Sequence, residues 1–66
     1  MDRDLFLARC HTKGAVTEEQ RAELIGVDRG TLRRWLRGET SPLLPAARRA
    51  ARALGVTTDE LWPDPQ

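Results

Sequence analysis

The sequence is poor in the residues that most often build reactive sites. Its 66 positions hold one cysteine, one histidine, no tyrosine, two tryptophans and one phenylalanine. A lone cysteine cannot form an internal disulfide, which excludes a small secreted scaffold held by disulfides. Cys10 and His11 are adjacent and have no second pair of ligands, so a zinc site is not expected. Because no set of nucleophile, acid and base is recognisable either, we expect no enzymatic activity, no cofactor and no small-molecule ligand.

Long hydrophobic runs are also missing. The longest apolar run spans residues 5–8, which is too short for a signal peptide or a membrane span. Hydrophobic residues make up 39% of the chain, enough for one small helical core near the lower size limit for folding without disulfides. We therefore expect a cytoplasmic protein with one domain over residues 1–62 and a short tail over residues 63–66.

Positive charge is modest in total but unevenly distributed. The formal net charge is +1. Residues 29–52 hold seven arginines against one glutamate, whereas residues 1–28 hold four basic and six acidic groups. Residues 53–66 hold three acidic groups and no basic one. A basic cluster of this kind is typical of a nucleic-acid-binding surface, although a solvated helix surface can carry the same arginines.

The centre of the chain has the pattern of two short helices joined at a glycine. Thr17, followed three residues later by Gln20, forms a capping box that starts a first helix. Gly26 ends that helix because glycine adopts the left-handed conformation without strain. Asp28 then caps a second helix over residues 28–37. Two helices with a short glycine-containing connection predict a helix-turn-helix.

The second of these helices has two distinct sides. Leu32, Trp35 and Leu36 fall on one side of the helical wheel and are expected to face the core. The opposite side carries Gly30, Arg33, Arg34 and Arg37, and the first turn carries Arg29 and Thr31. A helix with an apolar inner side and an arginine-lined outer side suits the major groove of DNA, which admits an α-helix.

Helical periodicity also appears before and after this pair. A first helix is expected over residues 2–13, with Phe6, Leu7 and Cys10 as its apolar stripe. A later helix has Pro45 in its first turn. Its expected apolar stripe is Leu43, Ala47, Ala50 and Leu54.

A last short helix is expected to start at Thr57, with Glu60 completing a second capping box. Trp62 follows it. This tryptophan either closes the core from the C-terminal side or lies in a dimer contact, where aromatic residues are enriched.

Together these segments resemble the phage Cro and repressor type of helix-turn-helix, the XRE-like or lambda-repressor-like family. Ala22 and Gly26 match the small residue and the turn glycine of that motif. The run GVDRGTLRRWLRGETSP is similar to the family's recognition helix and exit, and ALGVTTDEL resembles the stretch that joins its last two helices. The resemblance covers residues 5–62. It implies an all-α fold, a compact five-helix lambda-repressor-like domain with a central helix-turn-helix.

The resemblance further implies sequence-specific binding of double-stranded DNA by a transcriptional regulator, most simply a Cro or immunity repressor in a bacterial or phage-infected cell, associated with the nucleoid. Such regulators bind inverted half-sites as homodimers, which form here in solution or only on the DNA. The residues expected to contact bases are Arg29, Gly30, Arg33 and Arg34. The residues expected to contact phosphates are Thr17, Thr31, Arg37 and Thr40.

Several of these assignments have a structural alternative. Gly30 either lets the backbone approach a base or is a tolerated glycine in the first turn. Thr31 either contacts DNA or stabilises the helix. Glu18 stands where the family often has a phosphate-binding Gln, so it is expected to turn away from phosphate. Arg21 stands where the family usually has Leu, so its stem is expected to cover core surface while its guanidinium reaches water or an acidic partner; a DNA contact is the alternative.

Two other functions fit the sequence less closely. One is a protein-interaction or antitoxin-type adaptor that kept the fold, which the acidic start of the first motif helix and the modest net charge would suit. The other is an excisionase-like architectural DNA binder, although no β-hairpin pattern for a wing is present.

Overall fold

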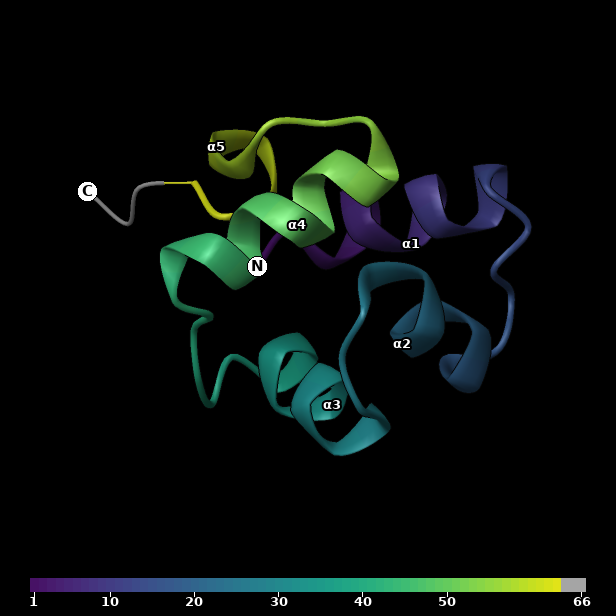
Figure 1. The fold of residues 1–66 in the computed structure, drawn as a ribbon, viewed down its shortest axis with the longest axis horizontal. Helices are drawn as coiled ribbons and strands as arrows, with labels where there is room; N and C mark the ends of the chain where they lie inside the picture. Colours follow the sequence, from purple (N-terminus) through teal and green to yellow (C-terminus); the bar gives the residue numbers. More distant parts are fainter. Residues whose placement is uncertain (64–66) are drawn as a thin grey trace.

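The computed structural model describes residues 1–63, which fold into five helices joined by short loops (Figure 1). They are α1 (Arg3–Thr12), α2 (Glu18–Ile25), α3 (Arg29–Arg37), α4 (Leu44–Leu54) and α5 (Thr58–Leu61). No strand is present in this part of the chain. The all-α, five-helix architecture with a central helix-turn-helix is confirmed. None of these helices is long and apolar enough to cross a membrane.

Local capping sets the boundaries of the motif helices as predicted. The hydroxyl oxygen of Thr17 accepts the amide of Gln20 at 3.1 Å, and the Gln20 side-chain oxygen accepts the amide of Thr17 at 3.1 Å. Gly26 ends α2 in the left-handed conformation, with φ at 77°. Asp28 starts α3 by accepting the amide of Thr31 at 3.1 Å. These bonds satisfy amides that a helix end leaves without a partner in its own backbone.

The core forms where α4 packs against α1, α2 and α5. The largest fully buried side chains are Phe6, Cys10, Ile25, Leu32, Leu54 and Leu61. Trp35 is 5% exposed and belongs to the same cluster. Complete burial of a Leu, Ile or Phe side chain contributes about 1.5–3 kcal/mol. Because Leu32 and Trp35 are both buried, the inner side of α3 is fixed and its outer side is left to solvent.

The predicted apolar stripe of α4 is right at three positions and wrong at one. Ala47, Ala50 and Leu54 are buried, together with Ala51. Leu43 is 81% exposed. It is the residue that precedes α4, with extended backbone angles of φ −67° and ψ 157°, so the helical period does not extend to it.

The two ends of the described chain meet. The amide of Asp2 donates to the carbonyl of Leu61 at 2.7 Å. Asp2 is the cap of α1 and Lys13 its last flanking residue, so α1 is one residue shorter at each end than predicted. The capping box of Thr57 and Glu60 is present as predicted.

Trp62 lies at the edge of the core. It is half-buried, and its ring meets that of Trp35 edge-to-face, with centroids 5.7 Å apart and planes at 85°. It therefore closes the core beside α3, the first of its two predicted positions. In the predicted tail, Pro63 is exposed, and residues 64–66 lie outside the described part of the chain.

Candidate nucleic-acid interface

The outer side of α3 carries four exposed arginines. We call Arg29, Arg33, Arg34 and Arg37 the arginine face. Within residues 1–63 no side chain of this set is buried under another helix. The sequence predicts Arg33, Arg34 and Arg37 on the side opposite Leu32 and Trp35, and Arg29 in the first turn. The burial of Leu32 and Trp35 is confirmed.

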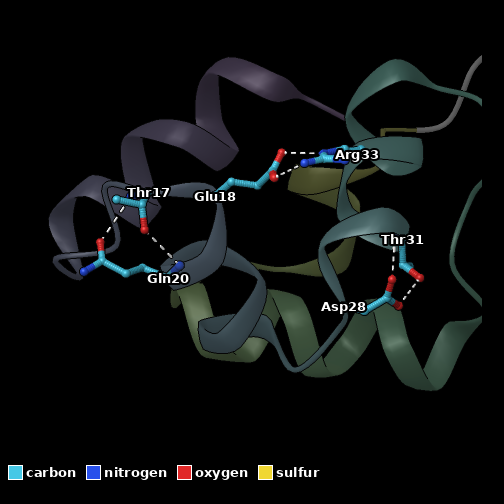
Figure 2. A network of polar contacts seen from close by, with 6 residues as sticks. All are labelled: Thr17, Glu18, Gln20, Asp28, Thr31 and Arg33. Carbon is cyan, nitrogen blue, oxygen red and sulfur yellow. Dashed lines mark hydrogen bonds and ion pairs between the residues drawn. The ribbon is translucent and has the colours of Figure 1, made fainter.

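One residue of the arginine face is held by the first helix of the motif. Figure 2 shows Arg33 beside Glu18, the first residue of α2. Arg33 Nε donates to Glu18 Oε2 at 2.9 Å, and Arg33 Nη2 donates to Glu18 Oε1 at 2.8 Å. The side chains of Arg33 and Glu18 remain 52% and 37% exposed. The prediction that Glu18 turns away from phosphate did not identify this partner.

The pairing acts on the ionisation of both groups. The bonds from Arg33 hold the pKa of the Glu18 carboxyl below its ordinary value, and the charges of Arg29 and Arg21 act in the same direction. The same bond raises the pKa of Arg33. Both groups are therefore charged at neutral pH. Parallel hydrogen bonds between a guanidinium and a carboxylate also fix the plane of the guanidinium.

A second set of hydrogen bonds lies at the start of α3, where Figure 2 shows Asp28 and Thr31. Asp28 accepts both the amide of Thr31, at 3.1 Å, and its hydroxyl, at 2.6 Å. The Thr31 oxygen in turn accepts Arg34 Nη2 at 3.3 Å. These bonds from Thr31 hold the pKa of Asp28 below its ordinary value. Asp28 therefore both caps α3 and orients, through Thr31, a second residue of the arginine face.

The space around Gly30 is limited on the side of the Asp28 carboxylate. A Cβ at this position would lie 3.1 Å from Asp28 Oδ2 and 3.8 Å from Arg34 Nη1. The first distance is tighter than most real Cβ contacts, so a larger residue would press on the carboxylate that caps the helix. This spacing decides neither of the two alternatives for Gly30.

The residues expected to contact phosphates differ in their exposure and in whether their polar groups already have partners in the chain. Thr40 and Thr17 are exposed, and the Thr17 oxygen already accepts an amide as the cap of α2. Arg37 is exposed and pairs with Glu39 at 3.3 Å. Thr31 is half-buried, and both its amide and its hydroxyl donate to Asp28. A phosphate contact from the Thr31 hydroxyl would require it to leave that carboxylate.

Arg21 and Cys10 are the two remaining residues whose roles the sequence left open. Arg21 is half-buried, and its Nε is buried without a hydrogen-bond partner among residues 1–63. The half-burial of Arg21 agrees with the expected position of its stem, whereas its Nε, expected in water or beside an acidic partner, is buried and has no such partner in that part of the chain. Burial raises the pKa of the Cys10 thiol, and the charge of Arg21 opposes that rise. A fully buried thiol with a raised pKa acts as a small hydrophobic residue.

Comparison with known proteins identifies the family. The family model described as helix-turn-helix matches residues 13–61 of this chain. That range contains both capping boxes, the glycine turn and the whole of α3. Comparison with curated proteins and with solved structures gave no match. The matched range covers most of the sequence, and the chain belongs to the XRE-like, lambda-repressor-like family of DNA-binding helix-turn-helix regulators.

Proposed function

We propose that this protein is a sequence-specific transcriptional repressor of the Cro or immunity type, and that it binds the major groove of double-stranded DNA with α3. One observation carries the proposal: Leu32 and Trp35 anchor the helix in the core while every arginine of the arginine face is exposed. An α-helix fits the major groove, and an arginine can bond both acceptors of a guanine edge.

Within this proposal, Arg34 and Arg33 are the main candidates for base readout. Arg29 and the backbone at Gly30 lie at the N-terminal end of α3, which enters the groove deepest in helix-turn-helix complexes. Thr17, Thr40 and Arg37 flank this region and are proposed to contact phosphates. Thr31 is proposed to contribute chiefly through Arg34, whose Nη2 it accepts.

We propose that the active form on DNA is a two-fold dimer on inverted half-sites about 34 Å apart. Two exposed leucines at the start of α4 support a contact between copies. Leu43 is 81% exposed and Leu44 is 52% exposed. Analytical ultracentrifugation with and without a two-site duplex tests this. A Leu43→Ser, Leu44→Ser variant is expected to lose cooperative binding of the second copy. Unchanged cooperativity would exclude this surface as the contact between copies.

The proposal is tested by selecting binding sites from random duplexes at about 0.15 M salt. The Arg34→Ala variant is then compared with Arg52→Ala, which removes the same charge from the exposed side of α4. We expect Arg34→Ala to abolish preference at defined base positions, at about 1–3 kcal/mol for each bidentate contact. Arg52→Ala should leave the preferences unchanged. Failure of any duplex to be enriched would contradict the proposed function.

A protein-interaction adaptor is the second candidate. The pairing of Arg33 with Glu18 and of Arg37 with Glu39 favours it, because two residues of the arginine face already bind carboxylates of the same chain. The adaptor hypothesis predicts no enriched duplex in the selection. An excisionase-like binder has less support, because residues 1–63 contain no strand that would form a wing.

A further inference from the structure

We propose that Glu18 is a positioning residue that directs Arg33 toward a guanine base and away from phosphate. The inference rests on the proposed DNA-binding function and deepens it. Glu18 begins α2 and Arg33 lies in the middle of α3. The carboxylate therefore reaches from one helix of the motif to the other.

The geometry of the pair leaves part of the guanidinium available. Glu18 binds the Nε and one Nη2 proton of Arg33. A guanidinium has five N–H groups, so both protons of Nη1 and the second proton of Nη2 stay available. Arg33 is 52% exposed, which leaves this outer edge open to a ligand. Two N–H groups from neighbouring nitrogens are what the O6 and N7 acceptors of guanine require.

The charge of the Arg33–Glu18 pair favours a contact of Arg33 with a base over a contact with phosphate. A free arginine is attracted to phosphate because both groups are charged. Glu18 neutralises Arg33 at a distance of 2.8 Å and presents its own negative charge beside it. A phosphate gains less from a guanidinium whose charge is already compensated by a carboxylate than from a free one. A guanine edge carries no net charge, so its hydrogen bonds to the outer edge of Arg33 are retained.

The neighbouring Glu19 provides a matched control. It lies in the same first turn of α2, is exposed, and has no ion pair among the described residues. Glu19→Gln removes the same charge from the same helix end without touching Arg33. Any effect that depends only on repulsion between DNA and the start of α2 should appear in both variants.

The test measures binding to the selected site, to its single-base variants and to an unrelated duplex over a range of salt concentrations. The variants are Glu18→Gln, Glu18→Asp, Glu19→Gln, Arg33→Ala and the double variant Glu18→Gln, Arg33→Ala. Circular dichroism spectra verify that each variant is folded. The aspartate keeps the negative charge, but its side chain is one methylene shorter and cannot make the same paired bonds.

We expect Glu18→Gln to reduce preference about tenfold at the base positions that Arg33→Ala affects, and to leave other positions unchanged. It should also strengthen binding to the unrelated duplex and steepen the salt dependence by about 0.9 in log–log slope, because the freed Arg33 contacts phosphate. The steeper slope distinguishes this from a phosphate contact made by the new glutamine amide, which is neutral and would leave the slope unchanged. Glu18→Asp should lose the same base preference without the steeper slope. In the Arg33→Ala background, Glu18→Gln should change no base preference.

Two results would overturn the inference. In the first, Glu18→Gln strengthens binding to all duplexes equally with base preferences intact, so that Glu18 only repels DNA. In the second, Glu19→Gln reproduces the loss of preference. Failure of the proposed function is seen separately and earlier, since the unmodified protein would then enrich no duplex.

Discussion

Trp35 and Trp62 meet edge-to-face, with ring centroids 5.7 Å apart. The contact joins α3 to the residue that follows α5, although 27 positions separate the two tryptophans in the sequence. Edge-to-face aromatic pairs contribute about 0.5–1.5 kcal/mol beyond the area they bury. The orientation of the arginine face therefore depends in part on the C-terminal end of the described chain.

Replacement of the two tryptophans should have graded effects on stability. Trp35→Ala removes a buried ring and should lower the free energy of unfolding by about 3–5 kcal/mol, enough to unfold much of a domain of this size. Trp62→Ala should cost less, about 1–3 kcal/mol, because Trp62 is half-buried. Urea denaturation followed by circular dichroism measures both. Equal costs for the two variants would contradict the assigned positions.

The turn of the motif depends on glycine for a backbone reason. Gly26 has φ at 77°, where a residue with a Cβ is strained by about 1–2 kcal/mol. The new Cβ of Gly26→Ala would lie 3.5 Å from Arg49 Nε, an ordinary contact that adds no clash. We expect Gly26→Ala to lower the free energy of unfolding by that backbone cost alone. Gly26→Asn should cost less, since Asn tolerates this conformation. A smaller cost for Ala than for Asn would refute the explanation.

Stability should fall in acid. The pKa values of Glu18, Asp28 and Glu60 are all lowered in the folded protein, each by hydrogen bonds to its carboxylate. A carboxyl with a lowered pKa in the folded state stabilises it above the unfolded pKa, and this contribution is lost as pH falls through the folded pKa. The melting temperature should therefore be constant near neutral pH and decrease below the ordinary carboxyl values of 3.8 for Asp and 4.5 for Glu.

Asp28→Asn isolates one part of this acid dependence. Asparagine can still cap α3, because its side-chain oxygen accepts the Thr31 amide, but it does not ionise. The variant should show a shallower decrease in melting temperature than the unmodified protein as pH falls below the ordinary Asp value of 3.8. Glu23→Gln is the control, since Glu23 is exposed and has no ion pair within residues 1–63. A decrease as steep in Asp28→Asn as in the control would contradict the role of Asp28.

Salt titration distinguishes phosphate contacts from base contacts. Arg37 lies at the C-terminal end of α3 and is proposed to contact phosphate. Its single bond to Glu39, at 3.3 Å between two largely exposed side chains, is longer than the paired bonds of Arg33 and has to open for that contact. Arg37→Ala should weaken binding to all duplexes by a similar factor and reduce the salt slope by about 0.9. Arg34→Ala should instead remove discrimination at defined base positions. Loss of base preference in Arg37→Ala would contradict this and indicate that Arg37 contacts a base in the groove.

The sequence predicts the local structure of this protein well because short-range chemistry determines it. The capping boxes of Thr17 and Thr57, the Asp28 cap and the Gly26 turn each involve residues no more than five positions apart. The exposure of the arginine face follows from the burial of Leu32 and Trp35 on the other side of α3. Each of these features is determined within a single helix or turn.

The features that the sequence does not predict depend on how helices and loops pack against one another. The partner of Arg33 lies 15 positions earlier, and the pairing depends on the angle between α2 and α3. The only signal in the sequence was the acidic residue at the start of α2 opposite a basic helix. The helical period predicts Leu43 in the core, whereas Leu43 lies before the first turn of α4 and is exposed. Ala15, 4% exposed in the loop after α1, has no periodicity that would have indicated its burial.

The hydrogen bond from the Asp2 amide to the Leu61 carbonyl makes the two ends of the described chain depend on each other. A four-residue helix such as α5 has too few internal bonds to persist alone. When α5 detaches, the Asp2 amide is released to solvent in the same event. The rate at which that single proton exchanges with deuterium therefore reports opening at the opposite end of the sequence.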